Sequence, residues 1–220
     1  MSRVLSPFQT SIGKKLIMAT TGGLLLAYVV GHMVGNLQIF LGPEALNAYG
    51  RFLHEFLHGG FLLSARLVLL VAVLLHIWAA VSLARANLAA RPQGYKRQQY
   101  VEASYASRTM IWSGPILAVF VVYHLLHLTT GHAHPEFVHG AVYENTVVGF
   151  QNWTVSAFYI VAVLSLGFHL RHGIWSMFQT LGANHPSYNS LIRLFSTVIT
   201  LIIVFGFITV PVAVLTGIVK

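Results

Sequence analysis

Five long apolar runs separate the charged residues of this 220-residue chain. The hydrocarbon core of a bilayer is about 30 Å thick, so a helix that spans it needs roughly 20 mostly apolar residues. Five stretches meet this requirement and predict spanning helices over approximately 16–41, 61–84, 109–130, 154–177 and 191–217. The first run is too long and too rich in glycine for a cleaved signal peptide. We therefore expect an all-α integral membrane protein, with residues 1–220 forming one transmembrane domain in which five helices make a bundle.

The composition excludes several classes of protein. Hydrophobic residues make up 56% of the chain and charged residues 8%, far from the usage of soluble domains. The net charge of +8 does not indicate a nucleic-acid partner, because Lys and Arg fall between the apolar runs instead of forming one basic surface. Since the chain has no cysteine, it has no disulfide, no thiolate-bound iron–sulfur cluster and no covalently attached c-type haem.

The basic residues predict the orientation of the helices. On the side of the N-terminus there are ten Lys and Arg residues: Arg3, Lys14, Lys15, Arg85, Arg91, Lys96, Arg97, Arg108, Arg171 and Arg193. On the other side there are three: Arg51, Arg66 and Lys220. Lys and Arg accumulate on the cytoplasmic side of membrane proteins. We therefore expect a cytoplasmic N-terminus and a C-terminus outside.

Twelve histidines are unusual in so apolar a chain. Six fall in predicted loops, where we expect solvated side chains: His54, His58, His132, His134, His139 and His185. Six fall within predicted spans: His32, His76, His124, His127, His169 and His172. An ionisable side chain inside a membrane is costly and marks a functional site by default. In a chain without cysteine, these histidines make metal binding the first hypothesis.

The helical rise of 1.5 Å per residue gives the depth of each histidine. His32 and His124 both lie roughly 22–24 Å from the inner edge of the bilayer, whereas His76 and His169 lie roughly 12–14 Å from it. Two histidines from different helices thus share each level. Two b haems stacked across the bundle, each held by two imidazoles, require this arrangement.

Two histidine doublets, His124/His127 and His169/His172, leave a choice of ligand. Residues three apart share a helix face but differ in depth by about 4.5 Å, so only one member of each doublet can bind a given iron. We prefer His124 and His169, which leaves His127 and His172 nearer the two surfaces to bind propionate, quinone or water. Arg171 has two interpretations, a propionate partner or a basic anchor that snorkels to the interface.

Glycines in the predicted spans have two interpretations as well. They allow the close approach of a helix to a haem, or they serve ordinary helix packing. These glycines are Gly22, Gly23, Gly31, Gly35, Gly114, Gly167 and Gly173.

Four motifs carry a resemblance to a known family: GHMVGN (31–36), LLHIW (74–78), VYHLLH (122–127) and FHLRHGIWSMFQTLG (168–182). Together they resemble the cytochrome b membrane-anchor subunit of succinate dehydrogenase/fumarate reductase, in its five-helix, two-haem form that reacts with menaquinone. The resemblance implies that His32 and His124 ligate a distal haem and that His76 and His169 ligate a proximal haem.

The resemblance also implies a function in the bacterial cytoplasmic membrane. Electrons from a flavoprotein subunit and an iron–sulfur subunit on the cytoplasmic face would pass through the two haems to a quinone. Succinate chemistry belongs to the partners, because this chain has no dinucleotide motif and no soluble domain of useful size. The basic loop 85–108 is either their docking surface or only a topology signal.

The quinone site is less constrained by the sequence. Candidates near the outer level are Asn36, Gln38, Glu55 and His127, with Glu55 equally interpretable as an exposed interfacial residue. Some two-haem fumarate reductases have a glutamate two residues before the fourth-helix ligand, where this chain has Gly167. A proton path through that helix is therefore not expected here.

Two alternatives compete with this prediction. A transporter or proton channel could use the histidines as a relay without a cofactor, although inverted repeats and broken helices are not evident. The membrane anchor of a hydrogenase or formate dehydrogenase would also hold two haems, but the fourth-helix motif and the helix count favour succinate dehydrogenase. The direction of the reaction is left open.

Overall fold

The computed structural model describes residues 6–90 and 105–220. No residue in these ranges lies in a strand. Along the chain the elements are α1 (Ser11–Asn36), η1 (Leu37–Leu41), α2 (Pro43–Glu55), η2 (Phe56–Gly59), α3 (Gly60–Ala89), α4 (Tyr105–Leu128), α5 (Val142–Gln151), α6 (Trp153–Thr180) and α7 (Pro186–Leu215). Arg3 and most of the predicted basic loop, including Arg91, Lys96 and Arg97, lie outside the described residues.

Five of the described helices are long and apolar enough to cross a bilayer: α1, α3, α4, α6 and α7. The predicted five-helix, all-α architecture is therefore confirmed. Their ends differ from the predicted spans by several residues. For example, α1 begins at Ser11 because Thr10 caps it, accepting a hydrogen bond from the Gly13 N–H. Hydropathy marks where the apolar stretch ends, whereas a helix continues beyond it as long as its backbone is paired.

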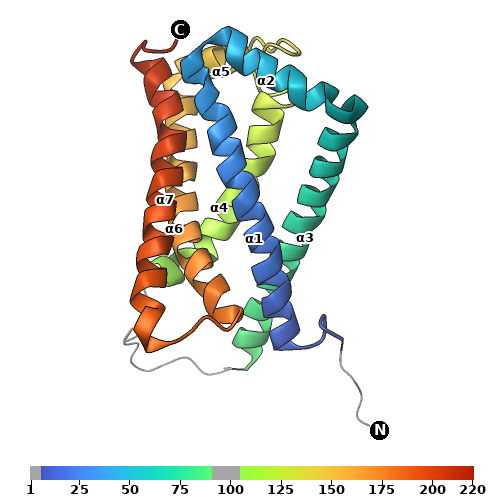
Figure 1. The fold of residues 1–220 in the computed structure, drawn as a ribbon, viewed down its shortest axis with the longest axis vertical. Helices are drawn as coiled ribbons and strands as arrows, with labels where there is room; N and C mark the ends of the chain where they lie inside the picture. Colours follow the sequence, from blue (N-terminus) through green and yellow to red (C-terminus); the bar gives the residue numbers. More distant parts are fainter. Residues whose placement is uncertain (1–5, 91–104) are drawn as a thin grey trace.

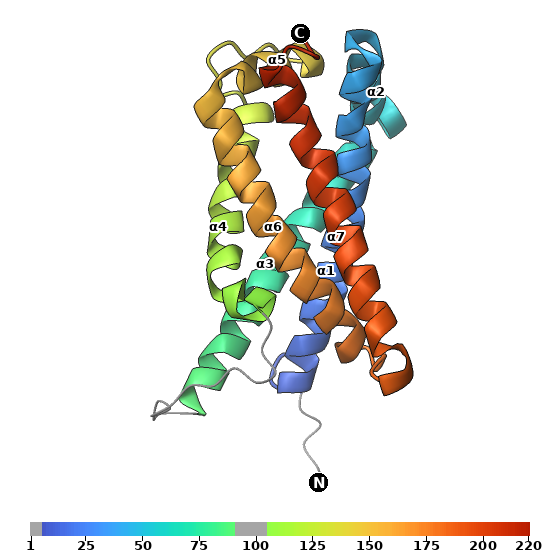
Figure 2. The same cartoon turned by 90° about the vertical axis from the view of Figure 1, so that its left-hand side faces the viewer.

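The spanning helices alternate in direction between two ends of the bundle (Figures 1 and 2). Helix α1 begins at one end, and the C-terminus, α2 and α5 lie at the opposite end. We call these the N-terminal end and the C-terminal end. By their places in the helices, the described basic residues of the N-terminal end are Lys14, Lys15, Arg85, Arg108, Arg171 and Arg193. The C-terminal end has Arg51, Arg66 and Lys220.

The bundle is built from two pairs of helices. α1 packs on α3, and α4 packs on α6. α7 lies against α6 and also contacts α1, so it joins the two pairs. This junction is a buried apolar cluster of Met33, Leu170, Ile174 and Ile203. The space between the pairs is where the histidines of α1, α3, α4 and α6 meet.

The predicted spans leave the segments 42–60 and 131–153 as loops between them, and the structure corrects this prediction. Each contains a helix, α2 and α5 respectively, at the C-terminal end of the bundle (Figure 1). α2 starts with Pro43 and Glu44, both favoured in the first turn of a helix. A search for about 20 consecutive apolar residues misses such helices, because an amphipathic helix along a membrane surface needs only one apolar face.

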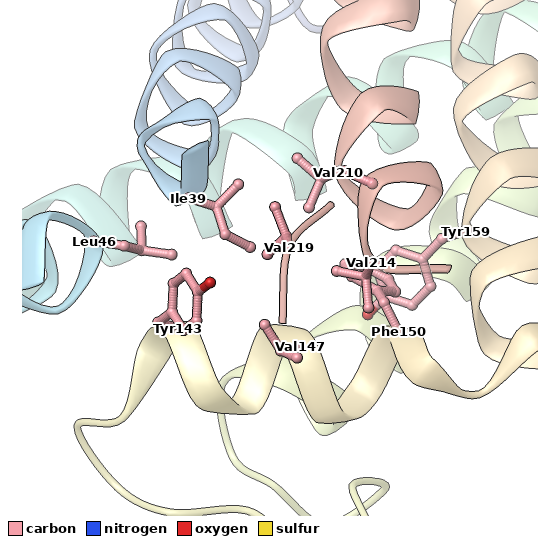
Figure 3. Close-up of a cluster of buried hydrophobic side chains, with 10 residues drawn as sticks. Ile39, Leu46, Tyr143, Val147, Phe150, Tyr159, Val210, Val214 and Val219 are labelled. Atoms are coloured by element: carbon pink, nitrogen blue, oxygen red, sulfur yellow. The ribbon is translucent and has the colours of Figure 1, made fainter. Parts of the chain in front are cut away.

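α2 and α5 form a cap over the bundle. Side chains from η1, α2, α5, α6, α7 and the C-terminus bury one another there (Figure 3): Ile39, Leu46, Tyr143, Val147, Phe150, Tyr159, Val210, Ala213, Val214 and Val219. Asn47 Nδ2 donates hydrogen bonds to both carboxylate oxygens of Glu144, at 3.3 and 3.0 Å. Asn47 Oδ1 accepts one from the Tyr143 N–H at 2.9 Å. These contacts hold α2 against α5, which covers the ends of α4 and α6.

Candidate functional site

Four half-buried histidines from four spanning helices meet in two pairs. The ring centroids of His32 on α1 and His124 on α4 lie 5.8 Å apart, with the ring planes at 80°. Those of His76 on α3 and His169 on α6 lie 6.2 Å apart, with the planes at 58°. Each pair therefore bridges the space between the α1/α3 side and the α4/α6 side.

The two pairs lie at different depths. His32 and His124 are each one turn before the end of their helices, near the C-terminal end of the bundle. His76 and His169 lie nearer the middle of α3 and α6. We call these the outer pair (His32 and His124) and the central pair (His76 and His169). The structure brings together the same partners that the depths estimated from the sequence had paired.

Hydroxyl groups on neighbouring helices orient the central pair. Thr21 Oγ1 lies 3.2 Å from His76 Nδ1, and Ser113 Oγ lies 3.3 Å from His169 Nδ1. Thr21 donates its only hydroxyl proton to the Ile17 carbonyl at 2.7 Å, so its oxygen accepts from the Nδ1–H of His76. The proton on Nδ1 leaves Nε2 of His76 with a free lone pair. This tautomer is the one that a metal-binding imidazole needs.

The outer pair has different partners. Tyr159 Oη lies 3.4 Å from His124 Nδ1, which leaves Nε2 of His124 available. His32 stacks on Tyr28, and its Nε2 lies 3.4 Å from Asn36 Nδ2. A metal bound through Nε2 of His32 therefore requires Asn36 to give up this long contact.

The spacing of each pair fits two imidazoles that share one metal ion. An imidazole–metal bond is about 2 Å long and the ring centroid lies about 1 Å behind the nitrogen, so rings on opposite sides have centroids about 6 Å apart. Within residues 6–90 and 105–220, no group of three or more His, Cys, Asp or Glu side chains could hold a metal ion. A b haem needs only two protein ligands, because the porphyrin supplies the other four. The residues present therefore fit a haem better than a bare ion.

The predicted glycines divide into two kinds. At four of them an added Cβ atom would come within 3.2 Å of a side chain of another helix: Gly22, Gly23, Gly35 and Gly167. At three others it would meet no atom within 4 Å: Gly31, Gly114 and Gly173. At Gly22 it would lie 3.2 Å from Cε1 of His76, so this glycine gives the imidazole room against α1. Helix packing thus accounts for only part of the glycine pattern.

His127 and His134 form a buried cluster under α5, and the burial of His134 corrects the prediction that it is solvated. His134 is 8% exposed, and its Nε2 donates to the Asn145 carbonyl at 2.9 Å while its Nδ1 accepts from the Glu136 N–H. His127 is 1% exposed, and its Nδ1 lies 2.9 Å from Tyr159 Oη. Only Nε2 of His127 is then left for the predicted propionate or quinone contact, which stays a prediction. The other five predicted loop histidines are exposed: His54, His58, His132, His139 and His185.

Arg171 and His172 lie near the end of α6. Arg171 is exposed, and its Nε donates to Thr197 Oγ1 on α7 at 3.3 Å. Successive helix residues are about 100° apart, so Arg171 and His169 point in nearly opposite directions. The contact with α7 favours the interfacial anchor over the propionate partner for Arg171. His172 shares the face of His169 and is half-buried.

The remaining predicted quinone residues lie at the C-terminal end of the bundle. Asn36 is the last residue of α1, and Gln38 lies in η1; both are half-buried. Glu55 is the last residue of α2 and is exposed. That exposure favours the interfacial interpretation of Glu55, whereas Asn36 lies next to His32.

Sequence reasoning missed the hydroxyl residues of the site, namely Thr21, Ser113 and Tyr159. Ser and Thr are common in membrane helices, where they bond their own backbone or a neighbouring helix. No spacing pattern marks those that reach an imidazole more than 30 positions away. Only the crossing of the helices shows which hydroxyl meets which histidine.

A family model described as "Succinate dehydrogenase/Fumarate reductase transmembrane subunit" matches residues 87–210. The chain belongs to this family. Searches of curated proteins and of solved structures found no match. The family resemblance predicted from the motifs is confirmed, and with its five apolar helices this succinate dehydrogenase/fumarate reductase transmembrane subunit is a multi-pass membrane protein.

The family match sets aside the transporter and the anchors of other respiratory complexes as interpretations of the chain. It includes His124 and His169, whereas His32 and His76 precede the matched residues. One histidine of each pair therefore lies in the matched part, and its partner is brought to it by α1 or α3.

Proposed function

We propose that this membrane subunit carries electrons from an iron–sulfur partner to a quinone through two b haems. His32 and His124, the outer pair, would ligate an outer haem. His76 and His169, the central pair, would ligate a central haem. The observation that carries this proposal is the meeting of four imidazoles from four helices in two pairs, at 5.8 and 6.2 Å between ring centroids. A bound b haem supplies reversible one-electron transfer at its iron.

The polypeptide contributes orientation and burial to this function. Hydroxyl groups hold the Nδ1 atoms of His76, His169 and His124, so their Nε2 atoms are kept as ligands. Both pairs lie on helices that are long and apolar enough to cross a membrane. Two pairs at successive depths suit a relay across the bundle.

The partners follow from the family, whose complexes oxidise succinate or reduce fumarate. We propose that a flavoprotein subunit and an iron–sulfur subunit dock at the N-terminal end, on the cytoplasmic side of a bacterial membrane. Six of the nine described Lys and Arg residues lie at that end, as a cytoplasmic face requires. The proposed direction of electron flow is towards the quinone.

The proposed quinone site lies at the C-terminal end, beside the outer pair. Asn36 and Gln38, both half-buried, offer hydrogen-bonding groups there. An apolar surface groove of about 260 Å³ between α4 and α6 lies at the same end, lined by Tyr123, Thr154, Val155 and Phe158. Quinones bind in apolar slots with few polar partners. That the quinone is menaquinone rests on the motif resemblance.

The first test is a reduced-minus-oxidised optical spectrum of the complex purified in detergent, with the haem quantified as its pyridine haemochrome. We expect a b-type spectrum and about two haems per chain, because each histidine pair holds one. Complex without haem would contradict the proposed relay, and a single haem would contradict one of the two pairs.

The absence of cysteine from the natural chain provides a direct test of topology. Single cysteines can replace Ala133, exposed at the C-terminal end, and Ser190, exposed near the start of α7 at the N-terminal end. In intact cells we expect a membrane-impermeant maleimide to label Ala133→Cys only. Ser190→Cys should react after detergent permeabilisation. The reverse pattern would place the N-terminus outside.

A further inference from the structure

The hydroxyl group of Tyr159 lies between two histidines of α4. Its oxygen is 2.9 Å from Nδ1 of His127 and 3.4 Å from Nδ1 of His124. The side chain is 6% exposed and packs edge-on against Phe150 and Phe120, with ring centroids 4.8 and 5.1 Å away. Figure 3 shows Tyr159 beside Phe150 in the buried cluster of the cap. This packing fixes the ring, so the hydroxyl group stays beside the two histidines.

The neighbours of His127 hold it in this arrangement. Its ring stacks between Tyr123 and His134, at centroid distances of 5.5 and 5.0 Å. His134 is fixed in turn by the backbone of α5 through the Asn145 carbonyl. Gly149 makes room for both rings, because a Cβ atom there would lie 2.8 Å from Cε1 of His127. The α5 cap thus fixes the position of the His127 ring beside the Tyr159 hydroxyl.

We propose that Tyr159 is a positioning residue for His124. A phenol donates one hydrogen bond, and we assign it to the shorter contact, 2.9 Å to Nδ1 of His127, so that the oxygen accepts from the Nδ1–H of His124 at 3.4 Å. This direction fixes the tautomer of His124 that leaves Nε2 for iron. The inference rests on the proposed haem ligation by His124. It adds two residues to the haem site: Tyr159 on α6, and His127 under the cap.

A measurable consequence is the reduction potential of the outer haem. An acceptor on the Nδ1–H makes an imidazole a stronger electron donor, which favours ferric over ferrous iron and lowers the potential. The donation to His127 strengthens this acceptor, because linked hydrogen bonds polarise one another. Loss of the Tyr159 hydroxyl should therefore raise the potential of the outer haem.

The test is a redox titration of the assembled complex carrying Tyr159→Phe, which removes only the hydroxyl. We expect an upward shift of one haem potential, an unchanged second potential and two haems per chain. Tyr143→Phe is the matched control from the same buried cluster, because its hydroxyl donates to the Lys220 carbonyl and to no histidine among the described residues, so neither potential should move. Thr21→Val removes the partner of His76 and should shift the other haem instead.

His127→Phe is a second variant, used if Tyr159→Phe does not assemble. It leaves the Tyr159 oxygen as acceptor but removes the acceptor of its proton, so the same haem should shift upward by a smaller amount. Unchanged potentials in Tyr159→Phe or His127→Phe, an equal shift of both haems, or the same shift in Tyr143→Phe would overturn the positioning role. Those outcomes leave the proposed relay intact, whereas a natural complex without haem would overturn the relay itself.

Discussion

Replacing His32 by alanine is expected to abolish the binding of one b haem and leave the other in place. A haem held by His32 and His124 would keep only one of its two protein ligands and would be weakly held. His76 and His169 lie deeper in the bundle and share no hydrogen-bond partner with His32 among the described residues. The measurement is the haem content per chain of purified complex, combined with a redox titration that identifies the remaining haem.

The reciprocal variant His76→Ala should remove the other haem and retain the outer one. His132→Ala is the control, because His132 is an exposed histidine of the C-terminal end whose side chain, within residues 6–90 and 105–220, hydrogen-bonds to Thr130 alone. Full haem content is expected for it. Two haems in His32→Ala, or loss of the same haem from both ligand variants, would contradict the assigned pairs.

Replacing Gly167 by leucine is expected to destabilise the packing of α6 on α7 by about 1–3 kcal/mol, the usual cost of overpacking a buried site. A Cβ atom at Gly167 would lie 2.8 Å from Cγ2 of Val204. The same contact explains why the glutamate that some fumarate reductases have at this point of the motif has no room here. The measurement is the thermal stability of the complex in detergent, with the lower midpoint expected in Gly167→Leu.

Gly60→Leu is the matched control, since a Cβ atom at Gly60 at the start of α3 meets no atom within 4 Å. Leucine also has a higher helix propensity than glycine by up to about 1 kcal/mol. The control should therefore be neutral or slightly more stable. An unchanged thermal unfolding midpoint in Gly167→Leu would contradict the prediction, because it would show that α6 and α7 can move apart without a measurable loss of stability.

The spanning helices could be predicted because the bilayer imposes a length and a composition that any short window of sequence displays. α2 and α5 could not, since a helix at the membrane surface needs neither 20 apolar residues nor a continuous run. The burial of His134 was missed for the same reason. It depends on the Asn145 carbonyl of α5, a helix absent from the prediction.

The histidine pairs could be predicted from the sequence because the depth of a residue along a helix depends only on its position in that helix, through a constant rise per residue. Depth identifies which histidines share a level, and residue type identifies what they can bind. The sequence by itself thus determined the five-helix membrane architecture and the two levels of imidazoles.

Only the tertiary structure decided what holds each imidazole and what the other polar residues face. Thr21, Ser113 and Tyr159 reach their histidines across helix crossings, and Arg171 turns towards α7. Such contacts depend on the rotation of each helix about its axis. That rotation is set by side-chain packing between helices, as at Gly167 against Val204, and no single helix encodes it in its own residues.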